Sequence, residues 1–563
     1  MTAVTRIDGA PGTGKTYTLT QRLERQKAGG LTPGDVNWIT FTNAGTEDAV
    51  ETVADVFPDL QGDDGDMKPD DVARTFHSLT LSLLLREGVV QFDYDLEPDP
   101  VIVQGQYNDD EPDPFADFCE TYALPYDGDT SDTRKLLSGE KQQTAAGNKF
   151  FAVYDYLNQT CKPPSKHYDA PVETTIPAER LEELLQKWDE YKRTAYDHRL
   201  YQFADYVHLA YEKNVVPDVE LLLIDEFQDF TPAEYRLYKC WRDSGAIDEI
   251  VLAGDPEQSI YSFRGASPLY FRETDRENDI DLTESYRCPQ PIAEAAVQIL
   301  DAHPQTSPRG FSGRSPDGRL RSRTIPTADD LGEDVLQSAR RVDSDGDRPR
   351  MMLLTRTNHQ LRKVSKALRS TGIPFDILGS GASLWDYSDL GDMLTFLNQF
   401  PDAGGYNAQK VESVLSRLPE RMYTEPRTSA KLGQTLEASA VHDALSRFDA
   451  PADIVRALDL ADWKNDALAA AVEAPASLTP EDVQIGTIHT AKGLEASSVY
   501  LFAEATDRIT EQYERDADAA AEEHRVWYVG TTRAAEELTI VDDLFNGPTA
   551  PPVEWLRLSG VIA

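Results

Sequence analysis

Short apolar runs, each followed by a helical pattern, recur along the chain and predict parallel β-sheets. The first runs are Thr2–Asp8, Asn37–Phe41 and Val72–Thr75, and the alternation returns later with LLLIDE and EIVLAGD. Continuous apolar residues are typical of strands that are buried on both faces of a parallel sheet. A second unit with the same alternation starts near Leu282. We therefore expect an α/β fold with two units.

Two stretches interrupt this alternation and indicate helical insertions. Helical periodicity runs through Phe115–Leu124 and Ala178–Tyr196, and Pro401–Pro480 is rich in Ala, Leu and charged residues. At 563 residues the chain exceeds what a single hydrophobic core usually covers, so several domains are expected. The expected division is residues 1–90 and 206–281 for the first α/β domain, 91–205 for its insertion, 282–400 and 481–548 for the second α/β domain, 401–480 for its short insertion, and 549–563 for a C-terminal tail.

The charge of the chain is strongly negative. It has 55 basic and 98 acidic residues, a net charge of −43 and a pI near 4.5, and the acids are spread over its whole length. Proteins that touch nucleic acid ordinarily carry a basic footprint. An evenly acidic chain repels itself in dilute salt, whereas at about 1 M salt the Debye length is only about 3 Å. Our hypothesis is a halophilic protein from a high-salt cytoplasm, and the alternative is an acidic protein that avoids DNA.

The cysteines and the apolar runs exclude some classes of protein. Cys119, Cys161, Cys240 and Cys288 lie far apart and form no CxxC pair, which favours reduced thiols over a zinc or iron–sulfur site. No apolar run is long enough to span a bilayer, and MTAVTRIDGA has no signal-peptide pattern. We expect a soluble, cytoplasmic protein with no membrane partner.

The segment GAPGTGKT follows the first predicted strand and opens the first predicted helix. It fits the phosphate-loop pattern G-x-x-x-x-G-K-[ST] in the strand-to-helix context that this pattern requires. Glycines let backbone N–H groups approach phosphate oxygens, while Lys15 can reach the β- and γ-phosphates and the Thr16 hydroxyl can ligate magnesium. The alternative is an ordinary Gly-rich turn. The residues expected to hold the nucleotide here are Gly9, Ala10, Pro11, Gly12, Thr13, Gly14, Lys15 and Thr16.

The segment LLIDEFQD, Leu222–Asp229, places two carboxylates at the end of an apolar run. The C-terminal ends of parallel strands are where open α/β sheets bind ligands. Together with the Gly-rich loop, Asp225 would complete a magnesium shell and Glu226 would orient or deprotonate the attacking water. ATP and Mg²⁺ are therefore the expected cofactors.

Two arginines of the second unit could supply the positive charge that phosphoryl transfer needs. Arg287 lies in ESYRCP and Arg533 in VGTTRAAEEL. An arginine finger contributes about 10³–10⁵ in rate. For an isolated arginine the alternative is a surface salt bridge.

Taken in order, nine segments resemble those of superfamily 1 helicases of the UvrD/Rep type. They are GAPGTGKT, ITFTNAGTEDAV, TFHSL, LLIDEFQD, AGDPEQSIYSFRGA, LTESYRCPQPI, LLTRTNHQL, IGTIHTAKGLE and EEHRVWYVGTTRAAEEL. The branches with 5′ to 3′ polarity are less similar, because they usually carry Gln-Gly where this chain has Lys492–Gly493. The resemblance implies an α/β fold of two RecA-like P-loop domains with parallel sheets, each interrupted by a mostly helical insertion.

The resemblance also implies roles for individual residues. Gln228 and Gln258 would sense the γ-phosphate, Tyr286 would stack on the adenine, and Glu495 would hydrogen-bond the ribose. The implied catalytic set is Lys15, Glu226, Gln258, Arg287 and Arg533, the metal ligands are Thr16 and Asp225, and Tyr17, Gln228, Tyr286 and Glu495 complete the nucleotide contacts. The implied single-strand track consists of Phe41, Asn43, His77, Tyr261, Phe263, Arg264, Arg356, Thr487 and His489.

The chain departs from the family pattern in three places. It starts almost directly on its first strand, where relatives usually carry an upstream Gln that reads the adenine edge. Tyr17 replaces a common Arg, and we predict that Tyr17 and Tyr286 sandwich the base. The second insertion, 401–480, is short for the family, and we expect this to reduce processive unwinding more than ATP hydrolysis.

Residues and resemblance together predict an ATP-dependent DNA helicase. It would translocate 3′ to 5′ on single-stranded DNA and unwind duplexes, with Mg-ATP hydrolysed between the two RecA-like domains. The alternative is a DNA-sensing or DNA-translocating ATPase subunit that serves a nuclease or a repair or defence complex without unwinding alone. We expect single-stranded and tailed duplex DNA as partners, a nuclease or a repair or replication protein as a further partner, and a monomer or weak dimer.

Overall fold

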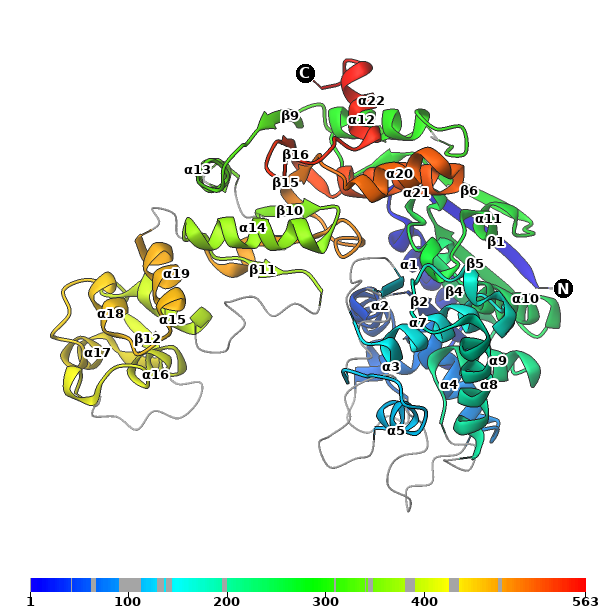
Figure 1. Ribbon diagram of the computed structural model, residues 1–563. Coiled ribbons are helices and arrows are strands. Elements are labelled where there is room, and N and C mark those ends of the chain that lie inside the picture. The colour runs from blue at the N-terminus through cyan, green and yellow to red at the C-terminus, as the bar shows by residue number, and fades with distance from the viewer. Residues whose placement is uncertain are drawn as a thin grey trace. The chain divides into compact units, whose positions relative to one another are not determined.

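The computed structural model divides into two compact units, Met1–Glu284 and Ser285–Ala563. In Figure 1 the chain is coloured from blue at the N-terminus to red at the C-terminus. The structure describes residues 2–41, 43–61, 67–90, 113–128, 136–137, 144–194, 200–307, 310–339, 341–342, 348–379, 390–424, 435–473 and 478–562.

The first unit is built on a parallel sheet whose six described strands lie in the order β3-β2-β4-β5-β1-β6. Their bounds are β1 Ala3–Gly9, β2 Val36–Thr40, β3 Ala73–Thr75, β4 Leu221–Ile224, β5 Glu249–Gly254 and β6 Asn278–Leu282. Because β4, β5 and β1 are neighbours and parallel, their carboxyl ends at Ile224, Gly254 and Gly9 share one edge of the sheet.

Helices cover both faces of this sheet. They are α1 (Lys15–Ala28), α2 (Asn43–Val56), α3 (Pro69–Val72), α4 (Phe76–Arg86), α9 (Phe203–Glu212), α10 (Pro232–Ser244) and α11 (Pro268–Glu273). Leu221 and Leu223 of β4 pack in the core with α1 and α2, whereas Leu222 and Ile224 pack in the core with α4, α9 and α10. Each such side chain contributes about 1.5–3 kcal/mol of burial free energy. The prediction of strands buried on both faces of a parallel sheet is confirmed.

The described part of the first insertion is helical and has its own core. It comprises α5 (Pro114–Thr121), α7 (Ala146–Gln159), the 3₁₀ turn η4 (Pro164–Asp169) and α8 (Ala178–Thr194). Phe115, Phe118, Phe151 and Trp188 pack edge to face or at a tilt, with ring centroids 4.8–6.3 Å apart. The start of the expected insertion, residues 91–112, lies outside the described residues.

The second unit contains another parallel sheet, and its six described strands lie in the order β11-β14-β10-β15-β16-β9. The strand bounds are β9 Arg319–Thr324, β10 Met351–Thr355, β11 Asp376–Ile377, β14 Val483–Thr487, β15 Ala496–Phe502 and β16 Ala534–Asp542, and the short pair β7 (Glu284–Ser285) and β8 (Ser312–Gly313) lies outside this sheet. The helices are α12 (Gln290–Asp301), α13 (Ala328–Ala339), α14 (Asn358–Ser370), α20 (Asp507–Arg515), α21 (Ala517–Thr531) and α22 (Pro551–Leu558). The expected fold of two α/β units with parallel sheets is confirmed.

Strand β9 was not predicted by the apolar pattern, because its sequence is RLRSRT. It pairs with β16, and Arg321 forms a 3.0 Å ion pair with Glu537 of that strand. Arg323 lies 3.6 Å from Asp334 of α13. The strand therefore forms through the backbone ladder and cross-strand charge pairs rather than through an apolar face.

The second insertion also has a core of its own. Its elements are α15 (Leu390–Gln399), β12 (Gly405–Asn407), α16 (Ala408–Leu415), β13 (Thr435–Glu437), α17 (Ala438–Ala444), α18 (Pro451–Ala457) and α19 (Asp462–Glu473). The core begins at Leu390 and extends to Ala471, so it takes in a helix that lies before the expected range of 401–480. Strands β12 and β13 form a small antiparallel pair within it.

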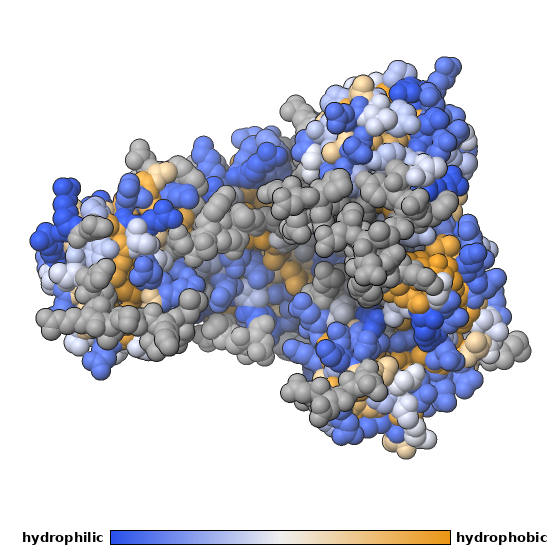
Figure 2. Space-filling model, turned by 90° about the horizontal axis from the view of Figure 1, so that it is seen from below, coloured by the Kyte–Doolittle hydropathy of each residue, from blue (hydrophilic) through white to orange (hydrophobic). Residues whose placement is uncertain are grey.

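Most of the described surface in the view of Figure 2 is hydrophilic, with smaller apolar areas between. Among the described residues, no helix combines the length and the apolar character that a membrane crossing requires. The largest exposed aromatic side chains include Tyr17 and Tyr286.

Candidate functional site

The Gly-rich segment Gly9–Thr16 forms a tight loop between β1 and α1. Gly12 and Gly14 adopt left-handed backbone with φ of 71° and 87°, which glycine enters without a Cβ penalty. A Cβ on Gly9 would lie only 2.5 Å from Thr13 Oγ1. Lys15 is buried, and its Nζ donates a 2.9 Å hydrogen bond to the Gly9 carbonyl oxygen. The loop thus folds around the lysine that its sequence pattern assigns to phosphate binding.

A hydroxyl and a carboxylate meet beside this loop. Thr16 Oγ1 donates a 2.9 Å hydrogen bond to Asp225 Oδ2, which brings the start of α1 to the end of β4. Burial and the charge of Glu226 raise the pKa of Asp225 to about 6, against the opposing pull of Lys15.

These two oxygen donors fit Mg²⁺. In nucleotide sites this ion is usually held by one or two protein groups together with phosphates and water. Within the described ranges, no group of three or more His, Cys, Asp or Glu side chains forms a metal cage. Two protein donors would leave the remaining ligand positions of Mg²⁺ to phosphate and water.

Glu226 sits on strained backbone. Its φ of 55° places a non-glycine residue in the left-handed region, and such strain is concentrated at functional sites. Gln228 donates a hydrogen bond from Nε2 to Glu226 and accepts a 3.0 Å bond from the Asp255 amide at Oε1. A Cβ on Gly254 would lie 2.4 Å from Gln228 Oε1. The absence of a side chain at Gly254, the last residue of β5, therefore leaves room for the buried Gln228 side chain to hydrogen-bond the Glu226 carboxylate.

The same network continues from Gln228 along the chain. Gln258 Nε2 donates a 3.0 Å hydrogen bond to Asp255 Oδ2, and Ser259 Oγ donates a 3.1 Å bond to the Gln228 carbonyl oxygen. All four of these side chains are buried. Hydrogen bonds thus connect the strand end that carries Glu226 to the segment that leads into the expected DNA track.

The aromatic residues of the expected track cluster in the first unit. Phe41 and Tyr261 stack with ring centroids 5.6 Å apart, and Phe263 meets Tyr261 edge-on at 5.8 Å. The Arg264 guanidinium lies 5.5 Å from the Phe41 ring centroid and donates a 3.0 Å hydrogen bond to Gln159 of α7. Tyr261 is buried, whereas Phe41 is half-buried.

His77 and Asn43 are two further residues of the expected track in the first unit. His77 lies 3.6 Å from Glu234, and its ring meets Phe203 edge-on at 5.3 Å. Burial and the nearby Arg264 lower the pKa of His77, while Glu234 opposes that shift. Asn43 is the first residue of α2, but its side chain lies outside the described residues.

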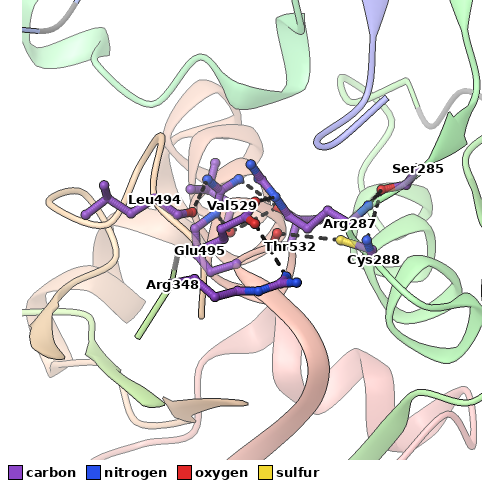
Figure 3. A network of polar contacts seen from close by, with 9 residues as sticks. Ser285, Arg287, Cys288, Arg348, Leu494, Glu495, Val529 and Thr532 are labelled. Atoms are coloured by element: carbon purple, nitrogen blue, oxygen red, sulfur yellow. Dashed lines mark hydrogen bonds and ion pairs between the residues drawn. The ribbon is translucent and has the colours of Figure 1, made fainter. Parts of the chain in front are cut away.

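In the second unit, three arginines bind two consecutive residues, Leu494 and Glu495, and Figure 3 shows two of them, Arg287 and Arg348, on the Glu495 carboxylate. Arg287 donates from Nε to one oxygen of Glu495, and Arg348 Nη1 lies 3.5 Å from the other. Arg533 is only 1% exposed and donates from Nη1 to the Leu494 carbonyl oxygen at 2.9 Å. Its Nε donates to the Val529 carbonyl oxygen at 2.9 Å. Both expected arginine fingers, Arg287 and Arg533, therefore contact the dipeptide Leu494–Glu495.

Tyr286 lines a cavity of about 390 Å³ in the second unit, whose lining includes arginines as well as the acidic residues Asp317, Glu536 and Glu537. Its ring is 62% exposed, and the Arg314 guanidinium lies 4.8 Å from the ring centroid. Arg287, Arg319 and Arg341 also line the cavity. In the first unit Tyr17 is 65% exposed, so both tyrosines of the expected sandwich present accessible rings.

The other expected track residues gather at the carboxyl ends of β10 and β14. Thr355 and Thr487 are opposite each other in these paired strands. Arg356 makes a bidentate ion pair with Glu523 of α21, from Nε to Oε1 at 3.1 Å and from Nη2 to Oε2 at 2.9 Å. Thr487 and His489 are buried, with 0% and 6% exposure.

Several residues of these networks were missed by sequence reasoning. Asp255 lies inside the segment AGDPEQSIYSFRGA and is preceded by an apolar strand, the signal that singled out Asp225. Arg314, Arg348 and Gln159 lie outside all nine segments. No local pattern marks them, because their contacts depend on residues 28 to 147 positions away.

Two family models match the chain. Residues 2–279 match the UvrD/REP helicase N-terminal domain, and residues 459–542 match the UvrD-like helicase C-terminal domain. Together they cover more than half of the chain and contain seven of the nine segments.

Curated relatives are similar at lower coverage. The chain is 26% identical over 405 residues to the ATP-dependent DNA helicase Rep of Escherichia coli K12, which covers 57% of this chain and 60% of that protein. It is 25% identical over 412 residues to the ATP-dependent DNA helicase PcrA of Staphylococcus aureus, covering 69% and 51%. It is 27% identical over 347 residues to the ATP-dependent DNA helicase UvrD2 of Mycobacterium tuberculosis, covering 58% and 48%. The chain thus spans about half to three-fifths of the length of these relatives.

Proposed function

The chain belongs to the UvrD/Rep helicase family, and from this premise we propose that it is an ATP-dependent DNA helicase. It hydrolyses Mg-ATP, translocates 3′ to 5′ on single-stranded DNA and separates duplexes. The observation that carries the proposal is the contact of Thr16 with Asp225 beside the buried Lys15, with Glu226 held by Gln228. The curated relatives named above are called ATP-dependent DNA helicases.

The first unit supplies the groups that bind phosphate and activate water. Lys15 turns from the Gly9 carbonyl oxygen toward the phosphates, and the loop amides surround them. Thr16 and Asp225 hold magnesium, which neutralises charge on the phosphate oxygens when it is bound. Glu226 orients the attacking water and accepts its proton. A general base of this kind contributes about 10²–10⁴ in rate.

The second unit supplies cations and base contacts. Arg287 and Arg533 stabilise the charge that develops on the γ-phosphate, and Glu495 bonds the ribose. Tyr286 offers an exposed ring for the adenine. We assign hydrolysis jointly to the two RecA-like domains, residues 1–90 with 206–281 and residues 282–400 with 481–548.

The first unit also supplies a route from the nucleotide to DNA. The hydrogen bonds from Glu226 through Gln228 and Ser259 lead to the cluster of Phe41, Tyr261 and Phe263. Aromatic rings bind bases without sequence preference at about 1–3 kcal/mol per base. A shift of Gln228 on ATP hydrolysis would move these aromatic rings along the single DNA strand.

An ATPase assay in a KCl series, with and without single-stranded DNA, tests the proposal. We expect DNA to stimulate hydrolysis by wild-type protein and Lys15→Ala to abolish it. Strand separation on duplexes with a 3′ or a 5′ tail then tests direction, and only the 3′-tailed duplex should open. Absence of DNA stimulation would overturn the proposal, and stimulation without strand separation would restrict the protein to DNA-dependent ATP hydrolysis.

A further inference from the structure

We propose that Glu495 aims Arg287 and that Arg348 is a positioning residue that holds Glu495 in place for this task. The proposal rests on the function proposed above, in which Arg287 contacts the γ-phosphate. It adds a second task to Glu495, besides the ribose contact that the family resemblance implies, and it gives a task to a residue outside the nine segments.

The contacts of Arg287 leave its terminal nitrogens available for a ligand. Its Nε donates to Glu495, and its backbone amide donates to Ser285 Oγ at 3.3 Å. Within the described residues, its two Nη groups take no part in these bonds. A guanidinium anchored through Nε presents both Nη groups in one plane, which is the geometry that bidentate phosphate binding uses. Glu495 therefore sets the direction in which the fork of Arg287 points.

The backbone on either side of the Glu495 side chain is fixed. Arg533 Nη1 donates to the Leu494 carbonyl oxygen at 2.9 Å, and the Ala496 amide donates to the Arg533 carbonyl oxygen at 3.1 Å. Gly493 makes the preceding turn at a φ of 88°. These backbone contacts do not fix the rotamer of Glu495. Ordering this side chain costs up to about 2 kcal/mol of conformational entropy.

Arg348 selects that rotamer from a fixed position. The Ser497 amide donates to the Pro349 carbonyl oxygen at 3.2 Å, and the Ser498 amide donates to the Arg350 carbonyl oxygen at 2.9 Å. These bonds tie the residues that follow Arg348 to β15, which begins directly after Glu495. Arg348 then approaches the carboxylate oxygen that Arg287 leaves available, as Figure 3 shows.

The burial of the three side chains suits a positioning role. Arg287 is 18% exposed, Arg348 is 25% exposed and Glu495 is 35% exposed. The Glu495 carboxylate lies between the two guanidinium groups and remains accessible to a ligand on one side. The Arg348 guanidinium also balances the charge of Glu495 while the Nη groups of Arg287 bind phosphate.

A mutant cycle in the full chain tests this arrangement. Arg348→Ala should lower kcat about fivefold, while Arg348→Lys should retain more activity because it keeps the charge. In a Glu495→Ala background, Arg348→Ala should have no further effect on kcat. Arg350→Ala is the matched control, since Arg350 forms a 2.8 Å ion pair with Asp482, is 27% exposed and lies two residues away. An equal loss of kcat from Arg348→Ala in both backgrounds would overturn the proposal.

A second measurement does not depend on ATP hydrolysis. Phenylglyoxal modifies accessible guanidinium groups, and peptide mass spectrometry can follow Arg287 alone. We expect Arg287 to be modified about threefold faster in Arg348→Ala and in Glu495→Gln, and at the wild-type rate in Arg350→Ala. Unchanged modification in both variants would overturn the positioning role. If the wild-type protein does not hydrolyse ATP, the proposed function is overturned, whereas the modification rate of Arg287 still tests the positioning role.

Discussion

Glu226 combines a strained backbone with a side chain held by a buried amide. The backbone φ of Glu226 is 55°, and Gln228 donates to its carboxylate while it accepts a hydrogen bond from the Asp255 amide. The sequence predicted which residues carry these groups, because an apolar strand followed by two carboxylates is a local pattern. It did not predict the contact between Gln228 and Asp255, since these residues meet only when β4 and β5 pair.

Replacing Glu226 by Gln tests its role as the base. The change keeps the size of the side chain and its ability to bond Gln228 but removes the charge that accepts a proton. We expect kcat for ATP hydrolysis to fall by about 10²–10⁴ while nucleotide binding persists, as measured by steady-state kinetics and by equilibrium binding. Glu220→Gln, an exposed carboxylate one residue before β4, is the control and should behave as wild type. Wild-type turnover in Glu226→Gln would remove the residue from the mechanism.

Replacing Gly254 by Ala tests the close approach of Gln228. The added methyl would lie 2.4 Å from Gln228 Oε1 and 2.9 Å from Phe271. We expect a loss of about 1–3 kcal/mol in unfolding free energy from overpacking, together with weaker stimulation of ATP hydrolysis by DNA. Gly34→Ala is the control, because its new Cβ would meet only Thr32 Oγ1 at 3.9 Å. Equal stability of both variants would show that the site relaxes without strain.

At the scale of elements, the apolar pattern succeeds where a strand is buried on both faces and fails where it is not. Strand β4 was predicted because LLLI reads as a continuous apolar run. Strand β9 was missed because alternating arginines hide it. The pair β12 and β13 was missed because three residues are too short to show a period.

Helix α21 carries a pH-sensitive contact with its neighbours. His524 Nδ1 lies 2.6 Å from the Ile299 carbonyl oxygen of α12, and Nε2 lies 2.9 Å from the Tyr513 hydroxyl of α20. Burial, with a smaller effect of His303 and Arg525, lowers the pKa of His524 to about 4, while the contact with Ile299 and the charge of Glu523 oppose the shift.

This depressed pKa predicts that acid weakens the second unit. The unfolded chain binds the proton near an ordinary histidine pKa of about 6.5, whereas the folded chain resists it until about pH 4. Stability is therefore lost as the pH falls through this window, by roughly 3 kcal/mol at most. Denaturation of wild type and His524→Gln across this range measures the effect. The wild type should lose its advantage toward low pH, and parallel curves would contradict the prediction.

At the scale of the whole molecule, the sequence predicted the two α/β units, whereas the residue bounds of the domains remain a prediction. The first compact unit ends at Glu284, close to the expected change at residue 282. The core of the second insertion begins at Leu390, because α15 packs in that core. The sequence of α15 resembles that of other amphipathic helices and does not show which core it joins. Packing partners, which decide such boundaries, are not encoded locally.

The net charge of −43 predicts that salt stabilises the chain. Dispersed acids repel one another in dilute buffer, and at about 1 M salt the Debye length of about 3 Å removes most of this repulsion. We expect the melting temperature to rise through a KCl series and to rise less with sucrose, which strengthens burial without screening charge. A melting temperature that is highest in dilute buffer would reject the halophile hypothesis.

The arginines of β9 have a consequence for how copies of this protein meet in solution. β9 lies at the edge of the described sheet, where unpaired backbone groups can template the addition of another strand. Its side chains Arg319, Arg321 and Arg323 lie on one face at every second position. A second copy of β9 that docked in register would bring like charges together along its whole length. We therefore expect the arginines of β9 to disfavour the addition of a second copy at this edge of the sheet.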